Sequence, residues 1–168
     1  MGYVLLLGGA RSGKSDLAQR LAVESALPVT FIATATGGDE EMADRIRRHR
    51  VSRPAEWSTV EEPVDLRGAV LAAPRDHFVV VDCLTLWVSN LLGSGSTPEE
   101  ISLQAQSCAS ELAGRRGVVV TNEVGLGIVP TNQLARTFRD VLGSVNAVFS
   151  RCAERSLLMV AGRTLDLR

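Results

Sequence analysis

The sequence contains few residues of the kinds that define secreted, membrane-spanning or nucleic-acid-binding proteins. Its 168 residues include only three cysteines, Cys83, Cys108 and Cys152, and none of them forms a C-x-x-C pair. This spacing indicates neither a disulfide framework nor a zinc knuckle. Aromatic residues make up 4 %, which leaves few side chains on which the bases of single-stranded nucleic acid could stack. No apolar run approaches the roughly 20 residues that span a bilayer.

The sequence also has no excess charge of either sign. Its 18 Lys and Arg residues against 19 Asp and Glu residues give a net charge of −1. No overall field therefore attracts nucleic acid or an anionic membrane, so any binding of phosphate must be local. The N-terminus has no basic and apolar leader. We expect a cytoplasmic protein with no nucleic-acid partner and no membrane span.

What the sequence does contain is a regular alternation of short apolar runs and longer helical segments. Apolar residues make up 45 % of the chain, enough to build the core of a single domain over residues 1–168. Strands that are apolar on both faces are typical of a sheet covered on both sides, and their alternation with helices predicts a three-layer α/β fold with a mostly parallel sheet. The expected strands are residues 3–7, 29–33, 78–81, 118–121 and 157–161, with a short extra strand within 56–61. The expected helices are residues 14–25, 39–51, 64–72, 85–92, 98–115 and 131–155.

A glycine-rich motif follows the first expected strand. Residues 8–15 read GGARSGKS and match the pattern G-x-x-x-x-G-K-[ST] at every specified position. Glycines allow successive backbone N–H groups to point at phosphate oxygens, and the helix that follows adds its positive N-terminal dipole. In such a motif Lys14 reaches the β- and γ-phosphates and the Ser15 hydroxyl binds Mg²⁺. The motif therefore predicts a P-loop that binds a nucleoside triphosphate.

Two acidic residues end later strands. Asp82 ends the strand over 78–81, where a second ligand for the metal is expected in P-loop folds. The alternative is that Asp82 caps the helix that begins near Thr85. Glu123 follows the strand over 118–121 and either has a similar role or stabilises a turn.

Five arginines surround a histidine in residues 45–53, which read RIRRHRVSR. A solvated helix face usually mixes acids with bases, and this run contains no acid. Neighbouring cations disfavour the imidazolium and so lower the pKa of His49, which keeps a neutral nitrogen available as a nucleophile. From the residues alone, His49 is either that nucleophile or part of a basic binding face.

Taken in order, these motifs resemble those of the bifunctional adenosylcobinamide kinase/adenosylcobinamide-phosphate guanylyltransferase family of cobalamin biosynthesis. The similarity covers nearly the whole chain. It includes the P-loop, the FIATA run at 31–35, His49 with Arg53-Pro54, and DCLT at 82–85. The most specific part is TNEVGLGIVP at 121–130, followed by Asn132, Arg136, Asp140 and Asn146.

The resemblance implies a RecA-like P-loop fold, a homotrimer and two reactions. In the first, ATP or GTP phosphorylates the aminopropanol hydroxyl of adenosylcobinamide, with Mg²⁺ as cofactor. In the second, a histidine attacks the α-phosphate of GTP, releases pyrophosphate, and passes GMP to adenosylcobinamide phosphate. That histidine falls on His49. The alternatives are a P-loop small-molecule kinase without nucleotidyl transfer, or a nucleotide-gated switch or ATPase.

The resemblance and the motifs together define an expected site. The catalytic residues are His49 and Lys14, and the metal ligands are Ser15 and Asp82. The expected nucleotide-binding residues are Gly8, Gly9, Ala10, Arg11, Ser12, Gly13, Lys14, Ser15, Ala33, Thr34, Ala35, Arg50, Val51, Ser52, Arg53, Glu61, Asp82 and Cys83.

Overall fold

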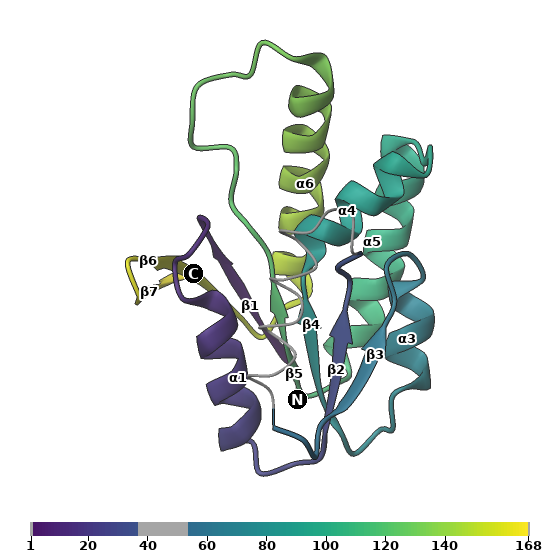
Figure 1. Ribbon diagram of the computed structural model, residues 1–168, viewed down its shortest axis with the longest axis vertical. Helices are drawn as coiled ribbons and strands as arrows, with labels where there is room; N and C mark the ends of the chain where they lie inside the picture. The colour runs from purple at the N-terminus through teal and green to yellow at the C-terminus, as the bar shows by residue number, and fades with distance from the viewer. Residues whose placement is uncertain (1, 37–53, 168) are drawn as a thin grey trace.

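A seven-stranded sheet forms the centre of the molecule (Figure 1), seen in a computed structural model that describes residues 2–36 and 54–167. The strand order is β3-β2-β4-β5-β1-β6-β7. Every neighbouring pair is parallel except β6 and β7. The strands are β1 (Tyr3–Gly8), β2 (Val29–Ala33), β3 (Ser58–Glu61), β4 (Phe78–Asp82), β5 (Gly117–Val120), β6 (Arg155–Val160) and β7 (Arg163–Leu167). The expected mostly parallel sheet is confirmed.

Helices cover both faces of this sheet. They are α1 (Lys14–Glu24), α3 (Leu66–Ala72), α4 (Leu84–Gly93), α5 (Pro98–Ala113) and α6 (Gln133–Cys152). Side chains alternate between the faces along each strand. Leu5 and Leu7 pack in a core cluster with α3, α4, α5 and α6, whereas Leu6 packs in a second cluster with α1. The three layers that the sequence predicts are therefore present.

Local sequence signals fix several helix boundaries. Thr97 caps α5, because its side chain accepts a hydrogen bond from the Glu100 N–H while the Glu100 carboxylate accepts from the Thr97 N–H. Asp65 caps α3 by accepting from the Gly68 N–H at 2.9 Å. None of the helices in the described parts of the chain has the length and apolarity needed to cross a membrane.

The C-terminal end of the chain differs from its expected layout. The helix expected over 131–155 is α6, which ends at Cys152, because Arg155 already pairs with Val4 as the first residue of β6. The strand expected over 157–161 is therefore Arg155–Val160. The final strand, β7, was not expected at all, and it pairs with β6 through a turn at Ala161 and Gly162. The helix expected over 39–51 lies outside the described residues.

Candidate active site

The P-loop connects β1 to α1, as its sequence predicts. Gly8 has a φ of 154°, and a Cβ atom at this position would collide with the Met159 carbonyl oxygen of β6. Gly13 has a φ of 95° and is the N-cap of α1. Only glycine adopts both conformations without strain, and a side chain at residue 8 would also push β6 away. The glycines of the motif are therefore required by the backbone path of this loop.

The side chain of Lys14 packs against the P-loop, and only 6 % of the residue's surface is exposed. Its ammonium group donates hydrogen bonds to the carbonyls of Gly8 at 2.9 Å and Gly9 at 2.6 Å, and to the Ser12 hydroxyl at 3.3 Å. A buried ammonium needs such partners, because desolvation of an unpaired charge is costly. These contacts place a positive charge within the loop whose N–H groups face a phosphate in other P-loops.

Ser15 and Asp82 meet at the edge of the sheet. The Ser15 hydroxyl donates to the Asp82 carboxylate at 3.1 Å, although the two residues are 67 positions apart. The N-cap of α4 is Cys83, so the alternative that Asp82 caps this helix is not what the structure shows. A hydroxyl beside a carboxylate suits Mg²⁺, which takes one or two carboxylates and completes its shell with phosphate and water oxygens. No larger cluster of metal-binding side chains occurs within residues 2–36 and 54–167.

The carboxyl ends of β3, β2 and β4 align in one row. Ala33 pairs with Glu61 on one side and with Asp82 on the other. Thr34 follows and is fully buried; its hydroxyl donates to the Cys83 carbonyl at 2.7 Å and accepts from the Cys83 N–H at 2.8 Å. Thr34 therefore holds the segment that carries Asp82.

Cys83 itself is buried beside Asp82, and burial raises the pKa of its thiol to about 11. The side chain thus remains an uncharged thiol at neutral pH. It lies at the expected edge of the sheet, but it does not supply a thiolate ligand there.

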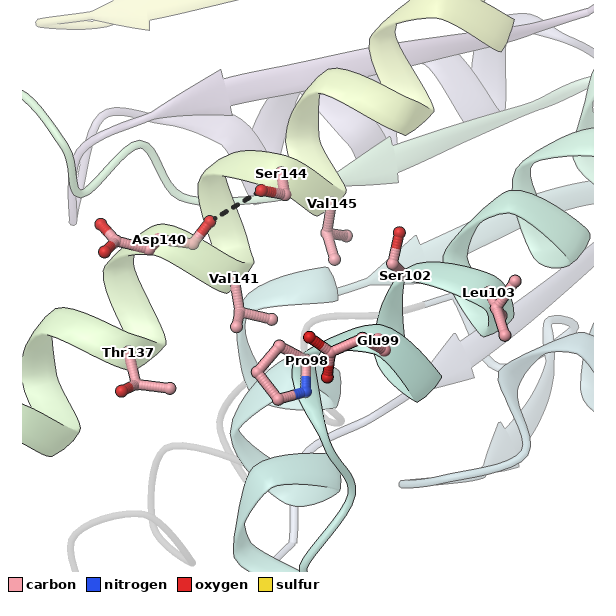
Figure 2. Close-up of a pocket in the computed structure, with 9 residues that line it drawn as sticks. All are labelled: Pro98, Glu99, Ser102, Leu103, Thr137, Asp140, Val141, Ser144 and Val145. Atoms are coloured by element: carbon pink, nitrogen blue, oxygen red, sulfur yellow. Dashed lines mark hydrogen bonds between the residues drawn. The ribbon is translucent and has the colours of Figure 1, made fainter.

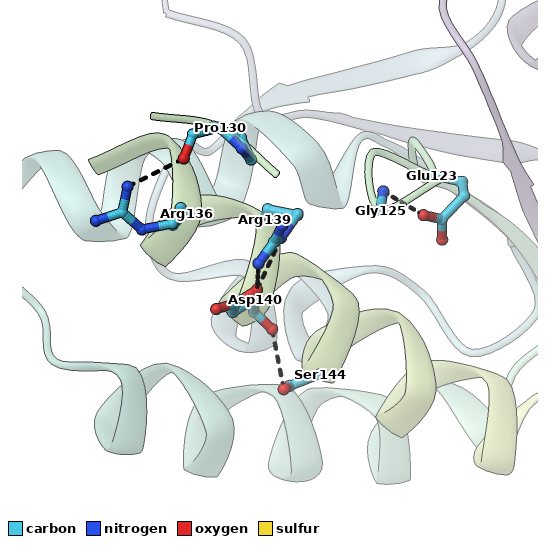
Figure 3. A network of polar contacts seen from close by, with 7 residues as sticks. All are labelled: Glu123, Gly125, Pro130, Arg136, Arg139, Asp140 and Ser144. Atoms are coloured by element: carbon cyan, nitrogen blue, oxygen red, sulfur yellow. Dashed lines mark hydrogen bonds and ion pairs between the residues drawn. The ribbon is translucent and has the colours of Figure 1, made fainter. Parts of the chain in front are cut away.

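Glu123 lies at the same edge, just beyond β5. Its backbone N–H donates to the Gly8 carbonyl at 3.2 Å, and its carboxylate accepts from the Gly125 N–H (Figure 3). The second contact stabilises a turn, which is one of the two roles that the sequence left open.

A buried asparagine, Asn146, forms hydrogen bonds with the residues that precede this turn. Asn146 of α6 accepts from the Thr121 hydroxyl at 2.7 Å and donates to the Asn122 carbonyl at 3.0 Å. The Asn122 N–H donates in turn to the Thr85 hydroxyl at 2.8 Å. The sequence analysis gave Asn146 no structural role. A signal was available, because Asn146 is four residues after Leu142 and three before Phe149 and so shares the apolar face of the helix.

The hairpin of β6 and β7 braces the P-loop, a contact that the sequence analysis missed. The Gly162 N–H donates to the Ser12 carbonyl at 3.1 Å. A signal was available, since Ala161 and Gly162 separate an apolar run from a short alternating one, which is typical of a two-residue hairpin turn.

The second half of the expected site lies outside the described residues. This applies to His49 and to Arg50, Val51, Ser52 and Arg53. The described part of the expected site, which comprises the P-loop, Ala33 to Ala35, Glu61, Asp82 and Cys83, lies along the carboxyl ends of β3, β2, β4 and β1.

A groove of about 670 Å³ lies elsewhere, between α5 and α6. Figure 2 shows Leu103 and Ser102 of α5 on one side and Val141, Val145 and Ser144 of α6 on the other. None of its lining residues belongs to the P-loop or to the row of strand ends. The groove is therefore separate from the phosphate-binding edge.

Comparison with solved structures shows the same fold in proteins of low sequence identity. The flagellar accessory protein FlaH from Methanocaldococcus jannaschii has a TM-score of 0.51 at 14 % identity, over 99 % of this chain and 76 % of that one. The RadB recombinase has a TM-score of 0.52 at 16 % identity, over 94 % and 73 %. The chain thus has the RecA-like P-loop fold.

Comparison with sequences is more specific. The family model described as cobinamide kinase/cobinamide phosphate guanyltransferase matches residues 4–167. The bifunctional adenosylcobalamin biosynthesis protein CobP of Pseudomonas aeruginosa is 45 % identical, over 98 % of this chain and 96 % of that protein. CobU of Escherichia coli K12, with the same description, is 40 % identical over 95 % and 96 %. The P-loop, the paired Ser15 and Asp82, and this full-length match together show that the chain belongs to the cobinamide kinase/cobinamide phosphate guanylyltransferase family.

Proposed function

We propose that this protein carries out two successive transfers on one corrinoid substrate. It first phosphorylates the aminopropanol hydroxyl of adenosylcobinamide with ATP or GTP. It then transfers GMP from GTP to adenosylcobinamide phosphate, giving adenosylcobinamide-GDP and pyrophosphate. The observation that carries this proposal is the contact between Ser15 of the P-loop and Asp82 of β4 in a chain that matches the family along its length.

The P-loop edge suits the phosphoryl transfer. Such a reaction needs alignment and neutralisation of charge more than covalent chemistry. The N–H groups of residues 8–15 hold the phosphates, and the Lys14 ammonium neutralises charge on the β- and γ-phosphates. Ser15 and Asp82 would hold Mg²⁺, which supplies further stabilisation of the phosphate charge when bound. Thr34 fixes the backbone on which Asp82 is carried.

The guanylyl transfer is assigned to His49. In this step an imidazole nitrogen attacks the α-phosphorus of GTP, a P–N bond forms, and the bond to the β-phosphate oxygen breaks as pyrophosphate leaves. A phosphate oxygen of adenosylcobinamide phosphate then attacks the same phosphorus and regenerates the histidine. The arginines at 50 and 53 carry positive charge suited to the departing pyrophosphate. These roles rest on the sequence and the resemblance.

The resemblance alone supports a homotrimer, and the composition supports a place in the cytoplasm. We place the protein in the cytoplasm as a homotrimer. Sedimentation equilibrium of the purified chain measures the assembly directly, with three times the chain mass expected and a monomer mass contradicting it.

The experiment that tests the division of roles compares His49→Ala with His77→Ala. His77 precedes β4 at the opposite end of the strand from Asp82, and its Nδ1 lies 2.8 Å from the Thr30 hydroxyl. After incubation with Mg·GTP and no acceptor, wild type and His77→Ala should gain the mass of one GMP, and His49→Ala should gain none. The label should be lost in acid and survive base, as a phosphoramidate does.

The same preparations are then assayed for both products. His49→Ala should still form adenosylcobinamide phosphate from ATP and should form no adenosylcobinamide-GDP. Equal loss of both products in folded protein would contradict the division and make His49 a shared phosphate-binding residue. Absence of any GMP adduct on wild type would instead favour a kinase without nucleotidyl transfer.

A further inference from the structure

The segment that joins β5 to α6 displays apolar side chains to solvent. Ile128 is 97 % exposed and Leu126 is 84 % exposed, and Val124 and Val129 are also exposed. We refer to residues 124–129 as the apolar loop. Contiguous exposed apolar side chains are uncommon on soluble proteins and mark surfaces that bind a partner or a ligand.

This apolar loop begins beside the P-loop. Glu123 immediately precedes the apolar loop, and its backbone N–H donates a hydrogen bond to the carbonyl of Gly8. Gly8 is the first residue of the phosphate-binding motif. The backbone N–H of Asn122 donates a hydrogen bond to the hydroxyl of Thr85, which is three residues after Asp82. In Figure 1 the segment rises from this edge of the sheet and passes across to the start of α6. The apolar loop is therefore an extension of the phosphate-binding edge.

Polar contacts hold the apolar loop at both ends. At the near end, the buried Asn146 of α6 forms hydrogen bonds with Thr121 and Asn122, which precede the apolar loop. At the far end, the Arg136 guanidinium donates to the carbonyls of Pro130 at 3.0 Å and Thr131 at 2.6 Å, the first of which Figure 3 shows. An anchored loop loses less entropy on binding than a free one. Its exposed side chains thus form a surface that is ordered before a ligand binds.

The chemistry of the acceptor indicates what covers this surface. Its reacting hydroxyl is at the end of a short arm, and that arm must reach the phosphate held by the P-loop. The rest of the acceptor is a corrin macrocycle, an apolar ring with amide groups at its periphery, and it must lie outside the P-loop but within reach of it. Ile128 is five residues beyond Glu123, so its Cα lies at most about 17 Å away.

The sequence of the apolar loop suits such a ring. Branched apolar side chains alternate with Gly125 and Gly127. Apart from Gly127 and its two chain neighbours, no atom of the protein lies within 4 Å of where a Cβ of Gly127 would be. A ligand can therefore approach the chain closely at Gly127, while the neighbouring side chains contact its hydrocarbon.

We propose that the apolar loop is the surface on which the corrin ring of the acceptor lies while its hydroxyl-bearing arm reaches the P-loop. This inference rests on the proposed function, since it requires a corrinoid acceptor. It assigns recognition of the ring to residues 124–129 and leaves nucleotide binding to the P-loop and Asp82.

The test compares Leu126→Ser/Ile128→Ser with the control Leu103→Ser. Leu103 is also exposed, but it lies on α5 in the groove away from the P-loop. Binding of cobinamide is followed by equilibrium dialysis, using the visible absorbance of the corrin. Loss of each buried apolar contact weakens binding by about tenfold, so the double variant should bind about 100-fold more weakly. Leu103→Ser should bind like wild type.

Two further measurements separate the possible outcomes. GMP labelling by Mg·GTP without acceptor should be unchanged in the double variant, because that step involves no corrin. Sedimentation equilibrium should give the wild-type mass. A lower mass would make the apolar loop a contact between copies of the chain and overturn the proposal, as would wild-type binding of cobinamide. Failure of the wild-type protein to bind cobinamide would overturn the proposed function itself.

Discussion

The P-loop and the apolar loop start from the same edge of the sheet and differ in what they present. In the P-loop, Lys14 is buried and its hydrogen bonds are directed at the loop's own carbonyls. In the apolar loop the polar contacts are at the ends, and Leu126 and Ile128 are exposed between them. In the proposed function, the first region binds the triphosphate, which all nucleoside triphosphates share, and the second binds the corrin ring of the acceptor. In this proposal, phosphate binding depends on buried groups, and selection of the acceptor depends on exposed apolar side chains.

The largest effect is expected from removing the charge of the P-loop. Lys14→Met keeps most of the aliphatic stem and loses the ammonium, so kcat for phosphorylation should fall by about 10²- to 10³-fold. Arg20→Ala, which removes an exposed cation from the same helix, is the matched control. Initial rates with saturating ATP measure both. A kcat for Lys14→Met within threefold of wild type would show that phosphate chemistry takes place elsewhere.

A smaller effect is expected at the metal site. Asp82→Asn should raise the Mg²⁺ concentration for half-maximal activity by at least about tenfold, because it removes one of the two side chains placed to bind the ion. The KM for nucleotide should change less. Asp16→Asn, an exposed acid in the first turn of α1, is the control. Superimposable Mg²⁺ titrations for Asp82→Asn and wild type would leave Asp82 with the structural contact to Ser15 alone.

The next effect concerns Asn146, which anchors the residues before the apolar loop, and the free energy of unfolding. Asn146→Leu leaves the Thr121 hydroxyl and the Asn122 carbonyl without their partner in a buried place, which should lower the free energy of unfolding by about 2 kcal/mol. Urea denaturation measures this. Adding Thr121→Val should recover part of the loss, because it removes one unsatisfied group. If the double variant is as unstable as the sum of the single ones, the two side chains act independently.

The smallest effect concerns pH. The Cys83 thiol has a pKa of about 11 in the folded protein against 9.0 for the free group, so the unfolded chain releases this proton first as pH rises. The free energy of unfolding should therefore fall between pH 9 and 11, with Cys83 contributing about 1 kcal/mol per pH unit. Cys83→Ala should show a shallower decline in urea titrations at pH 9, 10 and 11. Parallel declines would contradict the shift.

Much of the phosphate-binding edge was predictable because it is local. Residues 8–15 carry the glycines that their own backbone conformation requires, and the strand before and the helix after them follow from short-range patterns. The same holds for α5, whose capping box lies within four residues. The end of α6 was predicted wrongly, because helix propensity continued where pairing of Arg155 with β1 determined the structure.

The P-loop, the apolar strands and the family can be recognised from the sequence, since each depends on residues that are close together or in a fixed order. Three other features depend on tertiary packing: Ala33 lies between Glu61 and Asp82, β5 separates β1 from β4, and Asn146 anchors the residues before the apolar loop. These are pairings of segments far apart in the chain. Register and strand order depend on how whole faces pack together, and no local pattern contains that information.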